Sequence, residues 1–400
     1  ELTNLCDKSL LEGSAYQLFR LNPLLQHFIR EKTAEAPGLG QEALREHAAY
    51  YLGLIGSLLQ NLRRQNNLAQ TLEEIEREAA NLQAAAQYAG EAGWYAQLAA
   101  VNEALFYALE YRGLFSEGEA YFQNQITSLS RGQLPLPEAA LLGQALAYQG
   151  WFTLRTGRYQ DARLLFEDSQ AALAGAGASH ARLLASLGSA FLLSRQGDLP
   201  AAAALLEQTI AAAGQTGEAL LELTARLTLA EIRFNAGALE DPLTAFFDCL
   251  DQADEQNFIL HSIRALADLA DAFAAQGRVE EAAVHIQNSL ELNHAVSLSW
   301  LKAQLSRSVA RLSALQGDPQ HGESMLRSCL IDLRQSGDQI AVAETLAELA
   351  ELHVQQNQLV QASLHLQEAL RIALELRVEA LVLDLLTGIA GLLLEAGAPS

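Results

Sequence analysis

The stretch "SRQGDLPAAAALLEQTI" at residues 194–210 decides the fold, because its pattern returns at a fixed interval. "FNAGALEDPLTAFFDCL" follows at 234–250, and "AAQGRVEEAAVHIQNSL" at 274–290. Each copy contains the end of one apolar helix, a turn and the start of a second helix. The turn positions are Gly113, Gly157, Gly197, Gly237, Gly277, Gly317 and Asn357, with Gly397 near the end of the sequence. After a first step of 44 residues every step is 40, which indicates an internal repeat.

Small residues recur on both sides of each turn. Seven positions before it stand Gly150, Ala190, Ala230, Ala270, Ala310, Ala350 and Ala390. Five positions after it stand Gly118, Ala162, Ala202, Ala282, Gly322 and Ala362. Small residues at facing positions let two helices approach closely, so these columns predict tight helical hairpins. One copy has Pro242 in the second column, and we expect it within the first turn of its helix, where proline is tolerated.

Composition agrees with a helical protein and limits its partners. Half of the residues are hydrophobic and only eight of 400 are proline. The formal net charge is −22 with three lysines, Lys8, Lys32 and Lys302, which argues against direct nucleic-acid binding. No apolar run reaches membrane-spanning length, so we expect no membrane partner. The three cysteines lie far apart, which favours a reduced, cytoplasmic compartment.

The repeat columns resemble the tetratricopeptide repeat, a helix–turn–helix unit whose usual period is about 34 residues. A period of 40 implies longer helices. The resemblance covers residues 95–400 and implies an all-α, superhelical solenoid of helical hairpins, about seven to eight over 93–400. Because one hairpin cannot bury its apolar face alone, the copies are expected to stack on one another.

The N-terminal part does not follow the repeat. "LCDKSLL" at 5–11 and "YQLFRLNPLLQHFIREK" at 16–32 predict a short helix, a polar turn at 12–14, a strand within 16–21 and a helix after Pro23. This order of elements is typical of the end of a winged-helix fold.

The same segments resemble a known class of regulators. With "REHAAYYLGLIGSLL" at 45–59 and "LEEIEREAANLQAAAQYA" at 72–89, they look like the winged-helix segment and helical arm of the STAND class, the signal-transduction ATPases with numerous domains. We therefore expect the C-terminal part of a winged-helix segment at 1–36, a helical arm or linker at 37–92 and the repeat solenoid at 93–400. The sequence begins at Glu1 and has one methionine, Met325, so we interpret it as a piece of a longer polypeptide.

The resemblance also implies a nucleotide in the parent protein. Where the family usually carries a histidine that reaches bound ADP, this chain has Asn22. Asparagine can donate a hydrogen bond to a phosphate but cannot titrate; alternatively, Asn22 caps the helix that follows it. No GxxxxGK[ST] motif occurs, so we expect no ATP hydrolysis and no cofactor in this chain. ADP or ATP, and the parent's own nucleotide-binding domain as a partner, are implied for the parent.

Signs of catalysis are few. The nine histidines are dispersed, and neither HExxH nor CxxC occurs. We therefore expect neither an enzyme nor a metal site, and we expect the chain to be monomeric because STAND proteins typically assemble through the missing core.

The inner surface of the solenoid is the candidate binding site. Six positions before the turns stand Tyr107, Trp151, Phe191, Glu231, Asp271, Arg311 and Glu351. Two positions before the turns stand Tyr111, Arg155, Arg195 and Asn235. Ten positions before the turns stand Glu103 and Arg307, and thirteen positions before its turn stands Arg264. Aromatic rings beside arginines could stack on a sugar or a nucleobase, or hold a peptide. Alternatively, the aromatics fill space between long helices, and the charged half is a neutralised groove without a ligand.

Two functions remain open at this stage. In the first, the chain is the sensor module of a STAND regulator, which binds a small-molecule or protein inducer on the concave face and relays binding through the arm to the nucleotide switch. In the second, it is a constitutive scaffold that holds a partner peptide. The N-terminal resemblance favours the sensor, since a plain scaffold would not carry it.

Overall fold

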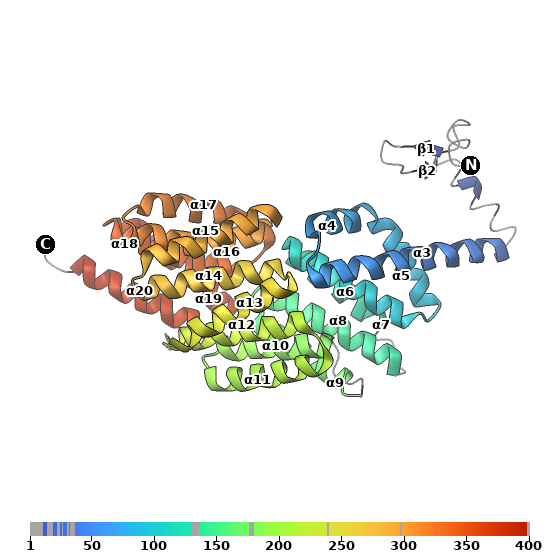
Figure 1. Cartoon of the computed structure of the whole chain (residues 1–400), viewed down its shortest axis with the longest axis horizontal. Helices are drawn as coiled ribbons and strands as arrows, with labels where there is room; N and C mark the ends of the chain where they lie inside the picture. The colour runs from blue at the N-terminus through green and yellow to red at the C-terminus, as the bar shows by residue number, and fades with distance from the viewer. Residues whose placement is uncertain are drawn as a thin grey trace. The chain divides into compact units, whose positions relative to one another are not determined.

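The protein is an all-α, tetratricopeptide-like solenoid of helical hairpins, as the repeat predicts (Figure 1). The computed structural model describes residues 11–13, 19–21, 25, 27–29, 32, 37–129, 136–175, 180–237, 240–296 and 298–397. Asn22, the predicted nucleotide-sensing residue, lies outside the described residues.

Seven hairpins and one further first helix make up the described part of the repeats. The first helices are α6 (Tyr95–Arg112), α8 (Leu136–Arg155), α10 (His180–Arg195), α12 (Ala219–Asn235), α14 (Ile259–Ala275), α16 (Ser299–Leu315), α18 (Gln339–Gln355) and α20 (Glu379–Gly397). The second helices are α7 (Phe115–Leu129), α9 (Tyr159–Ala172), α11 (Leu199–Thr216), α13 (Glu240–Gln256), α15 (Val279–Val296), α17 (Pro319–Ser336) and α19 (Leu359–Leu376). Figure 1 shows α10 to α19 following one another as stacked pairs.

The turns and small-residue columns have the predicted roles. All six predicted turn glycines have positive φ; at Gly317 φ is 83°, a region that residues with a Cβ rarely adopt. Asn357 takes the same conformation with φ of 57°, which asparagine tolerates. Across the hairpin of α16 and α17, a Cβ on Gly322 would lie 3.0 Å from the backbone of Ala310. The helices are therefore close because both columns are small. Pro242 is the third residue of α13, as expected.

Among its described residues, the N-terminal part contains a short strand pair, helical residues at 25, 27–29 and 32, and three longer helices. Strand β1 (Leu11–Gly13) pairs antiparallel with β2 (Phe19–Leu21). Part of the polar turn predicted at 12–14 is therefore strand, because ladder pairing satisfies its backbone groups. The helices α3 (Pro37–Arg64), α4 (Leu68–Arg77) and α5 (Ala79–Glu91) follow. The winged-helix segment and the bounds 1–36 and 37–92 stay predictions.

The chain divides into two compact units. One comprises Glu1–Gly56 and Arg77–Val101, and the other Ser57–Glu76 and Asn102–Ser400. All residues of the site described below belong to the second unit, including the turn between α3 and α4.

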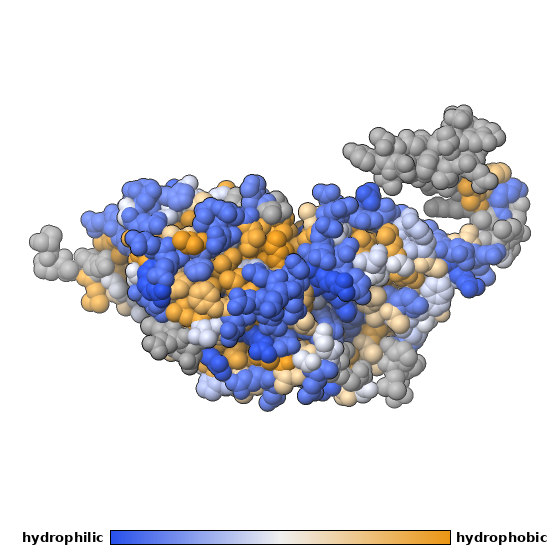
Figure 2. Space-filling view, in the orientation of Figure 1, coloured by the Kyte–Doolittle hydropathy of each residue, from blue (hydrophilic) through white to orange (hydrophobic). Residues whose placement is uncertain are grey.

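Aromatic and aliphatic residues fill the space between stacked hairpins. Phe122, Phe166 and Phe246 stand nine positions after their turns and are fully buried. Phe166 lies against the backbone of Gly150 and Gly188, where an added Cβ would come within 2.7 Å and 2.3 Å of its ring. The surface in Figure 2 is largely hydrophilic, with hydrophobic patches between helices and near the end of α20.

In the part of the chain that the structure describes, no helix is both long and apolar enough to cross a bilayer.

Candidate functional site

A cavity of about 460 Å³ lies along the first helices of successive repeats, from α6 to α18. Glu103 and Glu351 do not border it, but the other twelve residues that the sequence places on the concave face do. They are Tyr107, Tyr111, Trp151, Arg155, Phe191, Arg195, Glu231, Asn235, Arg264, Asp271, Arg307 and Arg311. The helix period explains this convergence, because residues at equal distances from each turn face the same side of every first helix.

The wall nearest α6 to α10 is aromatic. Trp151 and Phe191 are half-buried and border the cavity, and the guanidinium of Arg195 lies 5.0 Å from the centre of the Phe191 ring. Tyr107 and Tyr111 are only 4% and 6% exposed. The Tyr111 hydroxyl donates to the carbonyl of Leu62 at 3.4 Å. These two tyrosines thus support the wall, whereas Trp151 and Phe191 present surface to the cavity.

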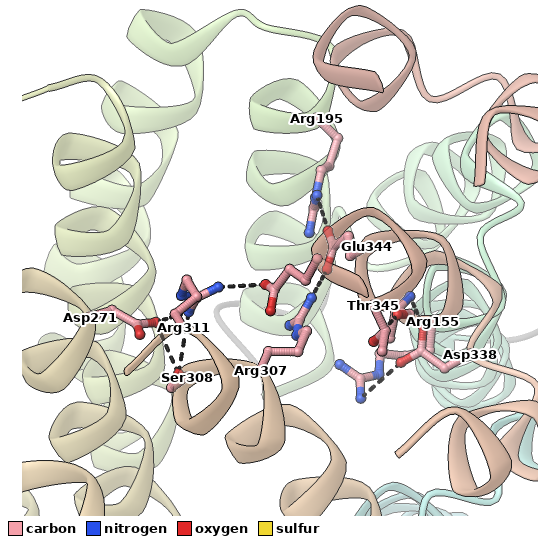
Figure 3. A network of polar contacts seen from close by, with 11 residues as sticks. Arg155, Arg195, Asp271, Arg307, Ser308, Arg311, Asp338, Glu344 and Thr345 are labelled. Carbon is pink, nitrogen blue, oxygen red and sulfur yellow. Dashed lines mark hydrogen bonds and ion pairs between the residues drawn. The ribbon is translucent and has the colours of Figure 1, made fainter. Parts of the chain in front are cut away.

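Ion pairs occupy the part of the cavity nearest α14 to α18. Arg195 donates to Glu344 at 2.6 Å, and Arg307 donates to the other oxygen of the same carboxylate. Figure 3 shows both guanidiniums pointing at Glu344 from different helices. Burial alone would raise the pKa of Glu344, but the two guanidiniums hold it at about 2. Glu344 is therefore ionised at every pH where the protein is expected to work.

Two further arginines are paired in the same way. Arg311 donates to Asp271 and, at 2.5 Å, to Glu348. Arg264 donates to Glu231 at 2.6 Å. Ion pairs of this kind orient the side chains, and an incoming anion would have to displace a carboxylate.

Arg155 lies between two carboxylates, 3.8 Å from Glu110 and 3.8 Å from Asp338. Burial raises the pKa of both carboxyls despite the guanidinium. Asp338 also accepts a hydrogen bond from the backbone N–H of Ala341 at 3.0 Å and so caps α18.

Carboxyls outnumber arginines around the cavity. Six carboxyls border it, Glu110, Glu231, Asp268, Asp271, Asp338 and Glu344, against five guanidiniums. Burial, and then the neighbouring charge of Glu231, raise the pKa of Asp268 well above its usual value. All five arginines have carboxylate partners, so the cavity has no uncompensated positive charge among the residues that the structure describes.

Contacts between distant repeats close the cavity. Arg195 and Glu344 are 149 residues apart, on α10 and α18. Gln65, in the turn after α3, accepts a hydrogen bond from the backbone N–H of Leu260 at 2.7 Å and lies 3.3 Å from His261. The N-cap residue Phe258 makes no side-chain hydrogen bond of its own. Gln65 therefore caps α14 from 195 residues away.

Sequence reasoning missed several residues of the site. Glu344 stands thirteen positions before Asn357, in the same column as Arg264. Asp268 and Ser308 stand nine positions before their turns, outside the predicted columns. Both columns follow the helix period and could have been found by extending the face. Gln65 has no repeat equivalent and therefore carried no such signal.

Burial keeps two thiols and one histidine of this unit in their neutral forms. No group of three or more histidine, cysteine or acidic residues that could hold a metal ion occurs among the described residues. Burial raises the pKa of the Cys249 and Cys329 thiols to about 12 and about 11, so they are poor nucleophiles. Burial and Arg264 lower the pKa of His261 to about 3, which keeps it neutral.

Comparisons with known proteins support the fold. No protein-family model and no curated protein matches the sequence. The crystal structure of a Rap protein complexed with competence and sporulation factor aligns with a TM-score of 0.56 and 13% identity, covering 83% of this chain and 99% of that chain. The Rap conjugation gene regulator of plasmid pLS20, in complex with the Phr* peptide, aligns with a TM-score of 0.57 and 14% identity. This alignment covers 81% of this chain and 96% of that chain.

A STAND protein with a tetratricopeptide repeat sensor, PH0952 from Pyrococcus horikoshii, also aligns, covering 96% of this chain and 60% of that chain. Its TM-score is 0.48 and its sequence identity 12%. The likeness to the two Rap proteins concerns the fold: helical repeats of the tetratricopeptide type.

Proposed function

We propose that this chain is a sensor and protein-interaction module that binds a peptide inducer in the concave cavity. The observation that carries the proposal is the cavity itself, bordered by aligned residues of seven first helices. An extended peptide suits a site that follows successive repeats, because it presents side chains at regular intervals along its length. One Rap protein of similar fold was solved with a peptide, which agrees with this ligand class.

The contact at Gln65 favours a sensor over a passive groove. Gln65 belongs to the turn between α3 and α4, and it caps α14 at the edge of the cavity. A ligand that displaces this contact, or strengthens it, changes the position of the turn relative to the repeats. Such a ligand binds with different affinities to the arrangement that has the Gln65 contact and to the one that lacks it. A switch requires this difference in affinity.

We further propose that the parent is a STAND-type regulator. The proposal rests on the sequence resemblance of the N-terminal part. In that parent, the winged-helix segment at 1–36 and the arm at 37–92 would relay peptide binding to an ADP- or ATP-binding domain outside this chain. Asn22 would be the nucleotide-sensing residue.

Thermal unfolding with a peptide library tests the binding site. A binding peptide is expected to raise the unfolding midpoint of the wild type and of the control Phe247→Ala. Phe247 is an aromatic residue of α13 that is 39% exposed and is not among the residues that border the cavity. In Trp151→Ala the shift is expected to disappear, because the aromatic wall loses its largest ring. An equal shift in Trp151→Ala would place the ligand elsewhere. If only small molecules raise the midpoint, the ligand class is wrong.

The second candidate, a constitutive peptide-binding scaffold, is favoured by the paired arginines, since a groove with saturated charges is preorganised. Gln65→Ala separates the two. For a sensor, the loss of the contact changes peptide affinity severalfold, and hydrogen exchange at the start of α14 responds to the peptide. For a scaffold, affinity in Gln65→Ala equals that of the wild type, and exchange slows only at the residues that the peptide covers.

A further inference from the structure

A second cavity adjoins the first at the C-terminal ends of four consecutive first helices. It has a volume of about 450 Å³ and is lined by the last two turns of α12, α14, α16 and α18. Its surface includes the side chains of Ala310, Ala314 and Leu352, with Ala310 and Leu352 only 1% and 4% exposed. Phe234, Asn235, Asp271 and Arg311 border both cavities, so the two adjoin at these residues.

Acidic side chains dominate the polar part of this second cavity. The described residues that border it include three acidic ones, Asp271, Glu348 and Glu351, and one cationic residue, Arg311. Arg311 donates to Asp271 and to Oε1 of Glu348. The other oxygen of Glu348, Oε2, is buried and has no hydrogen-bond partner among the described residues. One guanidinium thus faces three carboxyls, and one buried carboxylate oxygen still lacks a donor.

The backbone adds to this negative field. Each helix carries a partial negative charge of roughly half an elementary charge at its C-terminal end. Four such ends line the cavity, at Asn235, Ala275, Leu315 and Gln355. The last turns of α14 and α16 contain no basic residue that would offset them. The helix ends and the carboxyls therefore favour the same kind of guest, a cation.

The protonation of the two glutamates agrees with a shortage of positive charge. Burial raises the pKa of Glu348 even though Arg311 and Arg307 act in the opposite direction, and it raises the pKa of Glu351 even though Arg311 does. A second cation in the cavity would stabilise both carboxylates in their ionised form.

We propose that the second cavity binds a basic side chain of the peptide, with its alkyl stem on the alanine and leucine surface and its charged head at Glu348 and Glu351. Lysine and arginine both combine an apolar stem with a cationic end, which matches a cavity with an apolar floor and acidic residues around it. The assignment rests on the proposed function for the peptide, but the chemistry of the cavity can be tested without one.

The test uses n-butylammonium, which reproduces the stem and head of lysine, with 1-butanol as its uncharged counterpart. Ligand-detected NMR titrations of the whole chain measure both. Saturable binding of n-butylammonium is expected, about tenfold or more tighter than that of 1-butanol. Glu348→Gln keeps the shape of the side chain and an acceptor for Arg311, and it is expected to weaken n-butylammonium binding about tenfold or more.

Two further variants control for folding and for general charge. Glu351→Gln changes an exposed side chain at the cavity and is expected to weaken binding as well. Glu368→Gln removes an exposed acidic charge from α19 and is expected to leave binding unchanged. Circular dichroism verifies that each variant is folded. Absence of saturable binding, or equal binding in wild type and in folded Glu348→Gln and Glu351→Gln, overturns the assignment.

Peptides separate this inference from the proposed function. If the library gives no binder while n-butylammonium binds through Glu348, the proposed function fails and the cation site stands. If peptides bind in the first cavity and replacement of their lysine or arginine by norleucine leaves the affinity unchanged, the proposed function stands and the inference is wrong.

Discussion

Asp268 illustrates how single residues of the cavity depend on their surroundings. Its pKa is raised first by burial and then by the negative charge of Glu231. The folded protein therefore holds a proton that the unfolded chain would release above about pH 4. Glu344 behaves in the opposite way, since two guanidiniums outweigh its burial. Both carboxyls stand in columns that follow the helix period, yet only the packed structure determines the direction of each pKa shift.

The pH dependence of stability is the first prediction. A carboxyl with a raised folded pKa contributes stability that is fully present below the unfolded pKa and is lost as pH rises through the folded pKa. Asp268→Asn is therefore expected to reduce the fall in the free energy of unfolding between pH 5 and pH 8, where each such group contributes a slope of up to about 1.4 kcal/mol per pH unit. Urea unfolding at several pH values measures this fall. The exposed Asp251→Asn serves as control, and an unchanged slope in Asp268→Asn would contradict the prediction.

Glu344 contributes in the opposite direction. Its pKa of about 2 means that its stabilisation is present above the usual carboxyl pKa and is lost only as pH falls toward 2. It therefore does not mask the effect of Asp268 between pH 5 and pH 8.

At the scale of the elements, two features determine the geometry of each hairpin. One is a turn residue in the left-handed backbone conformation, and the other is a pair of small-residue columns where the two helices meet. Gly317 has φ of 83° and an open surrounding, so the conformation and not space selects glycine there. Gly391 differs, because it lies within helix α20, again with open space around a Cβ. The same substitution should therefore have opposite effects at the two positions.

Gly317→Ala is expected to lower the free energy of unfolding by about 1–2 kcal/mol, because alanine in the left-handed region is strained. Gly391→Ala is expected to raise helix stability by about 0.5–1 kcal/mol, since glycine is a poor helix former. Urea unfolding followed by circular dichroism measures both. Destabilisation of similar size in the two variants would show that packing, not backbone conformation, governs these glycines.

At the scale of the whole repeat unit, contacts between distant helices close the cavity. The ion pair between Arg195 on α10 and Glu344 on α18 joins helices that are four hairpins apart along the chain. Gln65 makes a second closing contact at the start of α14. A solenoid held by neighbour contacts alone would flex along its length, so these pairs limit how far the repeats can open.

Arg195→Met is expected to open the repeat unit and to lower the free energy of unfolding by about 1–3 kcal/mol, because it removes one partner of a largely buried pair. Small-angle X-ray scattering should report a larger radius of gyration. Arg371→Met removes an exposed i,i+4 pair with Glu375 and should change neither quantity measurably. Unchanged scattering in Arg195→Met would mean that this ion pair does not limit how far the repeats open.

The sequence by itself determined the hairpins, their period of 40 and twelve of the residues that border the cavity. These follow from local rules: positive φ at the turn, small residues at close contacts and the helix period. The tertiary structure alone decided that Arg195 meets Glu344, that Gln65 caps α14 and that four helix ends surround an acidic second cavity. The reason is physical: small rotations between successive repeats add up over the solenoid, and their sum brings distant residues together although no local pattern encodes it.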